Sequence, residues 1–156
     1  MRRKDRQVTD LQKIRGIIAD CDCCRVGFND DGQVYIVPMN FGIEWQDDTP
    51  VFYFHGATEG RKNDIVKVNP SVGFELDTGA ALIESDAACG HSARYQSIIG
   101  NGEMHCITDP QEKEKGLRLI MEHYTGKRDW AFSQQMLSAV TVFRLTATTF
   151  SCKEHL

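Results

Sequence analysis

The amino-acid sequence predicts a mainly β, antiparallel fold with flanking helices. Short segments rich in valine, isoleucine and aromatic residues are separated by turn residues along most of the chain, which is typical of strands joined in hairpins. Helical periodicity marks residues 10–20 and the segment after Asp109. Tight turns between neighbouring strands favour a closed or nearly closed barrel, because closure removes exposed strand edges. The periodicity alone leaves a β-sandwich as an alternative.

The chain has 156 residues, the size of one compact domain, and we expect residues 1–156 to form a single domain. Hydrophobic residues make up 41% and charged residues 26%, which is ordinary for a globular protein. The net charge of −4 argues against a general nucleic-acid or anionic-membrane binder, since such proteins need broad basic surfaces. A local basic pocket for one phosphate is compatible with this charge.

The sequence has no apolar run near the ~20 residues that a membrane helix requires. The basic opening Met1–Arg6 is not followed by the apolar segment of a secretory signal, so a cytoplasmic location is expected. The six cysteines are then expected as reduced thiols. Cys21-x-Cys23-Cys24 and Cys89-x-His91 suggest zinc, but the usual separations and a second complete pair are missing, so no metal site is expected.

The first part of the chain predicts a helix and then a β-hairpin. Thr9 to Gln12 has the form of a capping box, and apolar residues recur at helical spacing over residues 10–20. Residues 23–41 predict a hairpin whose turn is Asn29–Gly32. Pro38 has no N–H to give to a ladder, which indicates either an edge strand or a strand whose exposed groups line a ligand.

The rest of the chain predicts further strands with small helices between them. We expect a strand at 51–55, a short helix within 56–69, a strand at 71–77, an irregular loop at 78–90, a strand at 94–107 bent at Gly100 and Gly102, a helix begun by Asp109 and Pro110, and a final strand at 140–149.

The segment from His55 to Lys62 carries the clearest functional signal. A strand ends at His55, small residues and Gly60 permit close backbone approach, and a helix begins beside Arg61 and Lys62. Free N–H groups at a helix start favour an anion. An arginine can hold two phosphate oxygens, and a lysine adds a point charge. The segment therefore predicts a phosphate site, with a plain solvated helix start as the alternative.

Four segments carry a resemblance to a known family. Residues 35–41 read YIVPMNF, residues 52–57 read FYFHGA, residues 60–62 read GRK, and residues 95–102 read YQSIIGNG. With the opening MRRKDR and the Trp130 region, they resemble the nitroimidazole-resistance (Nim-type) branch of the pyridoxamine 5′-phosphate oxidase-like flavoproteins. The match runs through nearly the whole chain in the same order. It implies a split β-barrel that forms a homodimer and binds flavin mononucleotide (FMN) at the subunit interface.

The resemblance also implies which residues hold the cofactor. They are the backbone of Pro38, Met39 and Asn40 along the isoalloxazine edge; His55, Gly56 and Ala57 beside the ring and ribityl chain; Gly60, Arg61 and Lys62 at the phosphate; and Tyr95, Gln96 and Ser97 from the other subunit. A cofactor held in this way supplies the redox chemistry, while the protein positions it and tunes its electronics.

His55 is the expected catalytic residue, because the resemblance places a histidine here close to the flavin and its proton affinity suits proton donation to a substrate. The alternative is a histidine that only bonds neighbouring backbone. The other histidines are expected at the surface or in loops: His91, His105, His123 and His155. Trp45 and Trp130 are expected as packing or interface aromatics.

True pyridoxamine-phosphate oxidases carry an Arg-Leu-x-Pro-like ending whose arginine and histidine bind the pyridoxal phosphate, whereas this chain ends in SCKEHL and has no such pattern there. We therefore expect no vitamin B6 oxidation. Two functions remain: an FMN-dependent reductase of small, nitroaromatic or nitroimidazole compounds, and a non-catalytic protein that binds or stores flavin or haem. The fold does not choose between them. A flavin-free dimerisation domain is the third reading.

Overall fold

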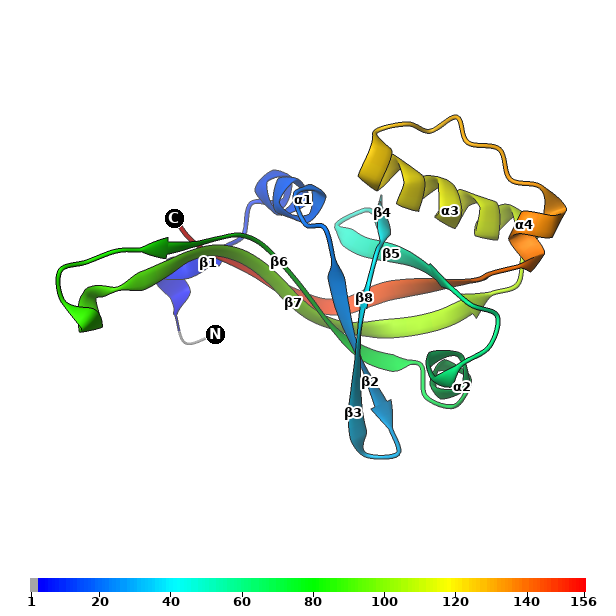
Figure 1. Cartoon of the computed structure of the whole chain (residues 1–156), viewed down its shortest axis with the longest axis horizontal. Coiled ribbons are helices and arrows are strands. Elements are labelled where there is room, and N and C mark those ends of the chain that lie inside the picture. Colours follow the sequence, from blue (N-terminus) through cyan, green and yellow to red (C-terminus); the bar gives the residue numbers. More distant parts are fainter. Residues whose placement is uncertain (1–2) are drawn as a thin grey trace.

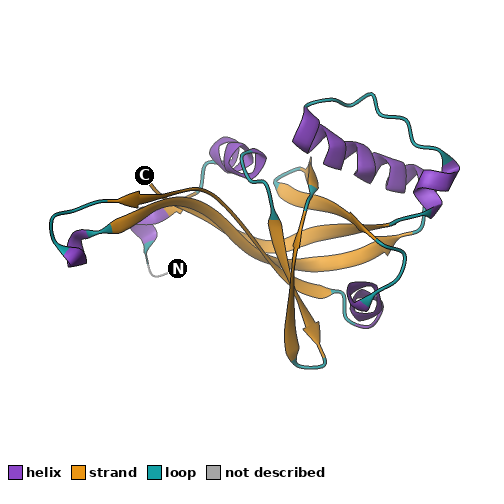
Figure 2. Ribbon diagram, in the orientation of Figure 1, coloured by secondary structure: helices purple, strands orange, loops and turns teal. Residues whose placement is uncertain are grey.

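The computed structural model describes residues 3–156 and contains one antiparallel β-sheet flanked by helices (Figures 1 and 2). The strands are β1 (Gln7–Val8), β2 (Cys24–Asp30), β3 (Gln33–Met39), β4 (Gly42–Gln46), β5 (Thr49–Gly56), β6 (Ser71–Ile83), β7 (Ser92–Ile107) and β8 (Thr141–His155). The α-helices are α1 (Leu11–Ala19), α2 (Arg61–Val68), α3 (Pro110–Thr125) and α4 (Gln134–Ser138). The mainly β, antiparallel class predicted from the sequence is confirmed.

The sheet is a barrel split between β3 and β4. Its strand order is β3-β2-β6-β7-β8-β5-β4, with β1 added beside β8. β3 and β4 follow each other in the chain, yet they stand at opposite ends of this order. The sheet curls around an aromatic core, whose fully buried members include Phe28, Phe41, Phe52, Phe54 and Phe143. Alternate residues of each strand fill this core, so the residues between them form the outer face.

The position of β3 shows why a proline, Pro38, is tolerated within this strand. Pro38 pairs with Arg25 of β2, and β3 has no partner on its other side among the described strands. A proline is tolerated here because the free side of an edge strand needs no ladder donor. The edge-strand reading is therefore correct, and the backbone from Pro38 to Asn40 borders the split of the barrel.

The starts of the helices follow local sequence signals, with one correction. Asp109 caps α3 by accepting a hydrogen bond from Glu112 N at 2.8 Å, with Pro110 in the first turn, as predicted. The expected capping box on Thr9 is wrong. Asp10 caps α1 instead, accepting from the backbone N–H groups of Gln12 and Lys13 at 2.8 and 3.3 Å.

The strands β6 and β7 form a long arm where an irregular loop was expected. Pairing continues through Ala81–Arg94 to Ile83–Ser92, so the predicted loop at 78–90 is wrong for its first residues. Figure 1 shows this hairpin extending well beyond the barrel, with the C-terminus beside it. Gly79, at φ +67°, lies at the irregularity between Thr78 and Ala81.

Three other elements also differ from expectation. The strand β4 and the short helix α4 were not predicted, and β8 runs six residues past Thr149 to His155. The bulge near Gly102 is confirmed, because the register with β8 shifts between Asn101 and Gly102. A β-carbon at Gly100 would overlap the Phe74 ring and the Thr149 carbonyl, so only glycine fits there.

The remaining chain-wide expectations concern membranes, metals and thiols. No helix of the described residues is long and apolar enough to cross a membrane. Within residues 3–156, no three His, Cys, Asp or Glu side chains gather as a metal ion would require. The six cysteines are free thiols, with Cys21 and Cys24 buried and Cys89 exposed. Burial, assisted by nearby carboxylates, raises the pKa of Cys21 to about 12.

Candidate functional site

The turn between β5 and α2 is built around a buried asparagine that the sequence did not reveal as important. Asn63 is 2% exposed, and its side-chain amide donates to the Ala57 carbonyl at 3.0 Å. Its backbone N–H bonds the Gly60 carbonyl at 2.9 Å. Gly60 has φ +133°, a value that favours glycine. These contacts fold residues 57–60 back onto the first turn of α2.

The start of α2 differs from the starts of the other α-helices. Side chains cap α1, α3 and α4, whereas within residues 3–156 no side chain caps α2. The first backbone N–H groups of a helix have no partner inside the helix, so those of Arg61 and Lys62 are available to a ligand. The partial positive charge of the helix start adds to both cationic side chains.

Lys62 lies directly beside the end of β5. A β-carbon built on Gly56 would come within 2.6 Å of Lys62 Nζ, so glycine is what lets the ammonium group approach this backbone. The ammonium also lies 5.8 Å from the centre of the Phe143 ring. In the described part of the chain, no carboxylate lies within 4.0 Å of it. Its charge is therefore unpaired and available to an anion.

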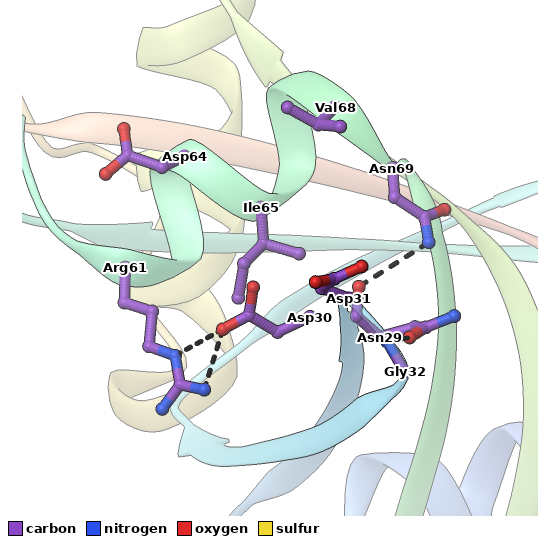
Figure 3. A pocket seen from close by; sticks show the side chains of 9 residues that line it. All are labelled: Asn29, Asp30, Asp31, Gly32, Arg61, Asp64, Ile65, Val68 and Asn69. Carbon is purple, nitrogen blue, oxygen red and sulfur yellow. Dashed lines mark hydrogen bonds and ion pairs between the residues drawn. The ribbon is translucent and has the colours of Figure 1, made fainter.

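Arg61 points from the same turn toward the β2–β3 hairpin. Figure 3 shows its guanidinium bonded to Asp30, and both distances, from Nε and from Nη2 to Oδ2, are 2.7 Å. The guanidinium also stacks over Tyr35, 4.4 Å from the ring centre. One edge of the guanidinium is thus occupied, and Nη1 has no hydrogen bond within the described part of the chain. The groove of about 870 Å³ beside it also contains Asp31 and Asp64.

His55 and the end of β3 lie at the same end of the barrel. Gly42 pairs with Tyr53 at the end of the β4–β5 ladder. Asn40 lies two residues before Gly42 and His55 lies two residues after Tyr53, so both lie beyond this last pair at the same end. His55 is exposed, and among residues 3–156 its ring has no hydrogen bond, so the reading of a histidine tied to neighbouring backbone is not what the structure shows. Pro38 and Asn40 are exposed at the strand edge, while the Met39 side chain is buried.

The segment Tyr95–Ser97 lies far from this group within one chain. Pro70, just after α2, accepts a hydrogen bond from Met104 N. Tyr95 lies nine residues before Met104 on β7, roughly 30 Å away at the usual strand rise. Tyr95 and Ser97 share the outer face of β7 with the exposed Ile99. Gln96 faces the other way and donates to Glu154 at 3.2 Å.

The family follows from a comparison with known proteins. Residues 10–154 match the family model described as pyridoxamine 5′-phosphate oxidase. The chain belongs to the pyridoxamine 5′-phosphate oxidase family. This family binds flavins, either FMN or flavin adenine dinucleotide (FAD). A search of curated protein sequences gives no match.

Solved structures share this fold. A candidate 5-nitroimidazole antibiotic resistance protein from Bacteroides thetaiotaomicron is 32% identical, with 95% of this chain and 86% of that chain covered and a TM-score of 0.80. An FAD- and haem-binding protein from Mycobacterium smegmatis is 18% identical, covering 96% and 73%, with a TM-score of 0.83. A flavocytochrome from Azotobacter vinelandii is 19% identical, covering 100% and 72%, with a TM-score of 0.80. The last two show the fold alone. The split β-barrel expected from the sequence is confirmed.

In this member of the pyridoxamine 5′-phosphate oxidase family, the residues around α2 fit a phosphorylated flavin. Two free backbone N–H groups and the unpaired Lys62 ammonium match a phosphate, and Gly56 leaves the backbone beside them uncovered. The Oδ1 atom of Asn63 is buried and has no hydrogen-bond partner within residues 3–156, which leaves one acceptor at this turn. These groups would hold the phosphate and the ribityl end of the cofactor.

Two histidines of this family member are placed differently from expectation. His123 is half-buried on α3, and its Nε2 lies 2.8 Å from the Cys21 carbonyl. His155 is half-buried in β8, and its Nδ1 lies 2.8 Å from the Ala93 carbonyl. The prediction of surface or loop positions is therefore wrong for both. Trp45 is a packing aromatic, as predicted, lying 4.6 Å below the Arg15 guanidinium.

Proposed function

We propose that this protein binds FMN and uses it to reduce small acceptors, with nitroaromatic or nitroimidazole compounds as the substrate class. The observation that carries the proposal is the uncapped start of α2, where the backbone N–H groups of Arg61 and Lys62 and an unpaired ammonium converge next to Gly56. A phosphate monoester can bind all of these donors, since it accepts several charge-assisted hydrogen bonds at once. FMN carries this group, which makes it the better fit of the two family flavins.

The rest of the site is ordered along the cofactor from phosphate to ring. Lys62 and the free edge of Arg61 bind the phosphate. The exposed backbone of Pro38 to Asn40 contacts the polar edge of the isoalloxazine, because an edge strand leaves its carbonyl and N–H groups unpaired. When bound, the flavin supplies a pair of electrons.

His55 is proposed to handle the protons of the reaction. A nitro group that accepts two electrons also takes up two protons and loses one oxygen as water. The His55 ring is exposed and forms no hydrogen bond within residues 3–156, so it is free to donate one of these protons to a nitro oxygen. It recovers the proton from solvent.

A homodimer is part of the proposal, because the outer face of the sheet is suited to a second copy. Gly27 and Gly73 are paired neighbours on β2 and β6 and expose bare backbone. Val34 and Ile36 beside them are 77% and 61% exposed. We call this surface the Gly27–Gly73 hollow; it is lined by Arg25, Gly27, Val34, Ile36, Gly73, Phe74, Glu75 and Gly100.

The same outer face continues along β7 through Ile99 to Ser97 and Tyr95. A copy docked on the hollow would therefore cover this part of β7 as well. Such a dimer would bring Tyr95 and Ser97 to the partner's flavin, whereas they are too far from the start of α2 in their own chain to contact a flavin there. Gln96 faces away from this surface and is proposed to act only through its backbone.

The substrate class rests on the 32% identical protein from Bacteroides thetaiotaomicron, whose description concerns 5-nitroimidazole resistance. Vitamin B6 oxidation is not part of the proposal. A reduced pyridine nucleotide is the electron donor to be tested first.

The test begins with the protein purified without added cofactor. The expected result is a yellow protein with flavin absorbance, from which mass spectrometry of the released small molecule identifies FMN. Mixing it with a reduced pyridine nucleotide and a nitroimidazole should consume both compounds. His55→Ala should retain the colour and lose most of the nitro reduction. Arg61→Ala with Lys62→Ala should lose the colour.

Three outcomes would contradict this function. A colourless protein that binds neither FMN nor FAD would exclude flavin chemistry. A yellow protein that leaves both the nucleotide and the nitro compound unchanged would indicate a binding or storage protein instead. Full flavin content in the double variant would place the phosphate away from α2.

A further inference from the structure

The last turn of α3 contacts the backbone at the split of the barrel, and this contact points to a role for Tyr124. We propose that Tyr124 is a positioning residue, whose hydroxyl sets the direction of the Asn40 carbonyl toward the flavin ring. The proposal rests on the proposed function, since it takes the Pro38–Asn40 backbone to be the surface that meets the isoalloxazine edge.

The Tyr124 hydroxyl bridges two backbone segments. It donates to the Asp22 carbonyl at 2.7 Å, and it accepts a hydrogen bond from Phe41 N at 3.2 Å. One segment precedes β2 and the other follows β3, which are paired at Cys24 and Met39. A single hydroxyl on a helix thus joins the start of one strand to the end of its neighbour.

Planarity of the peptide bond connects this bridge to the site. The N–H of Phe41 and the C=O of Asn40 belong to the same peptide unit and point in opposite directions. Fixing the N–H toward Tyr124 therefore fixes the carbonyl away from α3. Asn40 is exposed at the edge of β3, so its carbonyl is an acceptor for a donor on a bound ring.

Phe41 is fully buried, and this makes the bridge hard to replace with water. Its ring packs against His123, with ring centres 4.3 Å apart, and against Phe52 at 5.8 Å. An N–H at such a residue that loses its acceptor stays unpaired or reorients. Burial raises the pKa of Tyr124, and this effect is larger than that of the hydrogen bonds with Asn40 and Phe41, which lower the pKa. The hydroxyl therefore keeps the proton that it donates to the Asp22 carbonyl.

His123 supports the same turn from the neighbouring position of α3. Its Nε2 donates to the Cys21 carbonyl, since a carbonyl can only accept, and this fixes the tautomer with the proton on Nε2. The two residues together hold residues 21–22 and the Phe41 backbone against α3. Within residues 3–156, His123 forms no hydrogen bond with Asn40 or with Phe41 N, so its effect on a ring at Asn40 should be the smaller one.

The test compares Tyr124→Phe with wild type for two ligands, FMN and riboflavin, which share the ring but differ in the phosphate. Loss of the hydroxyl should weaken both by a similar factor, about three- to tenfold, because the disturbed contact is at the ring. The absorbance maximum and reduction potential of the bound flavin should shift as well. Thr125→Val removes the next hydroxyl of the same helix end, which bonds Met121 O and Lys127 N, and should change none of these values.

Results of several kinds would be decisive. Unchanged flavin affinity, spectrum and potential in Tyr124→Phe, with only a lower melting temperature, would overturn the positioning role. If Tyr124→Phe does not fold, His123→Leu measured in the same way must shift the flavin spectrum in the same direction for the proposal to stand. Wild-type protein that binds neither ligand would refute the proposed function itself. Wild-type protein that binds both, with Tyr124→Phe indistinguishable from it, would refute only the role of Tyr124.

Discussion

The Arg61 guanidinium is held between the Asp30 carboxylate, at 2.7 Å, and the face of the Tyr35 ring, at 4.4 Å (Figure 3). The two contacts come from the two strands of the β2–β3 hairpin, Asp30 from β2 and Tyr35 from β3. They keep one edge of the guanidinium engaged and leave the other edge free. They also place a negative charge close to the proposed position of an FMN phosphate.

Removing that charge should strengthen FMN binding. In Asp30→Asn the side chain keeps its size and an acceptor for Arg61, but it no longer repels the phosphate. Because the ion pair is partly exposed, its electrostatic effect is modest, and we expect a two- to fivefold gain in FMN affinity, about 0.5–1 kcal/mol. Isothermal titration with FMN and with riboflavin measures it, and riboflavin affinity should stay constant. A loss of FMN affinity would mean that Asp30 acts by orienting Arg61 instead.

The approach of Lys62 to Gly56 gives a second prediction. In Gly56→Ala, the new β-carbon would lie 2.6 Å from Nζ and 2.8 Å from Cε, so the flexible lysine must move away. Loss of one charge-assisted hydrogen bond should lower FMN affinity about tenfold, with a small effect on melting temperature. Gly16→Ala on α1 is the matched control, because nothing lies within 4 Å of its β-carbon; it should bind FMN normally. Equal FMN affinity in both variants would remove Lys62 from the phosphate site.

The sequence was informative where the determinants are local. The Asn29–Gly32 turn is found as predicted, with Gly32 N bonded to Asn29 Oδ1 at 2.9 Å, and so is the cap of Asp109. Each of these depends on residues within three positions of one another. The junction from His55 to Lys62 was found for the same reason, since a strand end, glycines and a helix start follow one another directly.

The parts that were missed depend on contacts between distant residues. Asp30 pairs with Arg61 across 31 positions, and the Tyr124 hydroxyl reaches Asp22 across 102. The sequence periodicity of α3 indicates which side of the helix the Tyr124 ring occupies, but it says nothing of where the hydroxyl goes. Asn63 sits in a short polar helix, and only the folded turn reveals that its amide holds the Ala57 carbonyl.

The arm was missed for a related reason. Residues 78–83 are rich in alanine and glycine, which are weak strand formers, and they become a strand only because residues 92–96 lie beside them. A two-stranded ribbon is marginally stable in water by itself. The arm continues directly from the paired parts of β6 and β7, which contributes to its stability.

The proposed dimer can be tested on the Gly27–Gly73 hollow. Ile36→Glu places a charge on a surface that a second copy would bury without a partner for it, which costs several kcal/mol. Light scattering after gel filtration should show a monomer, with loss of bound flavin because Tyr95 and Ser97 no longer reach it. Met136→Glu, at a residue 51% exposed on α4, should leave both mass and flavin content unchanged. A dimer that survives Ile36→Glu would place the interface elsewhere.

The Glu44 carboxylate joins α3 to the sheet and should make stability depend on pH. It accepts a hydrogen bond from the Tyr53 hydroxyl at 2.8 Å and pairs with Lys115 at 2.5 Å. Burial acts to raise its pKa, but the contacts with Lys115 and Tyr53 outweigh burial and hold the pKa of Glu44 below its usual value of 4.5. A carboxyl whose pKa is lowered on folding stabilises the protein above its unfolded pKa.

This stabilisation should therefore be complete at neutral pH and disappear as the pH falls through the lowered pKa. Glu44→Gln keeps the acceptor for Tyr53 and removes the charge. Because Lys115 is exposed, we expect the free energy of unfolding of the variant to be only about 1 kcal/mol lower than that of the wild type at pH 7. This difference should shrink below pH 4.5 until both proteins have the same free energy of unfolding. Urea unfolding across this range, followed by tryptophan fluorescence, measures it. A difference that stays constant with pH would show that packing of α3, and not the Glu44 charge, is what the substitution disturbs.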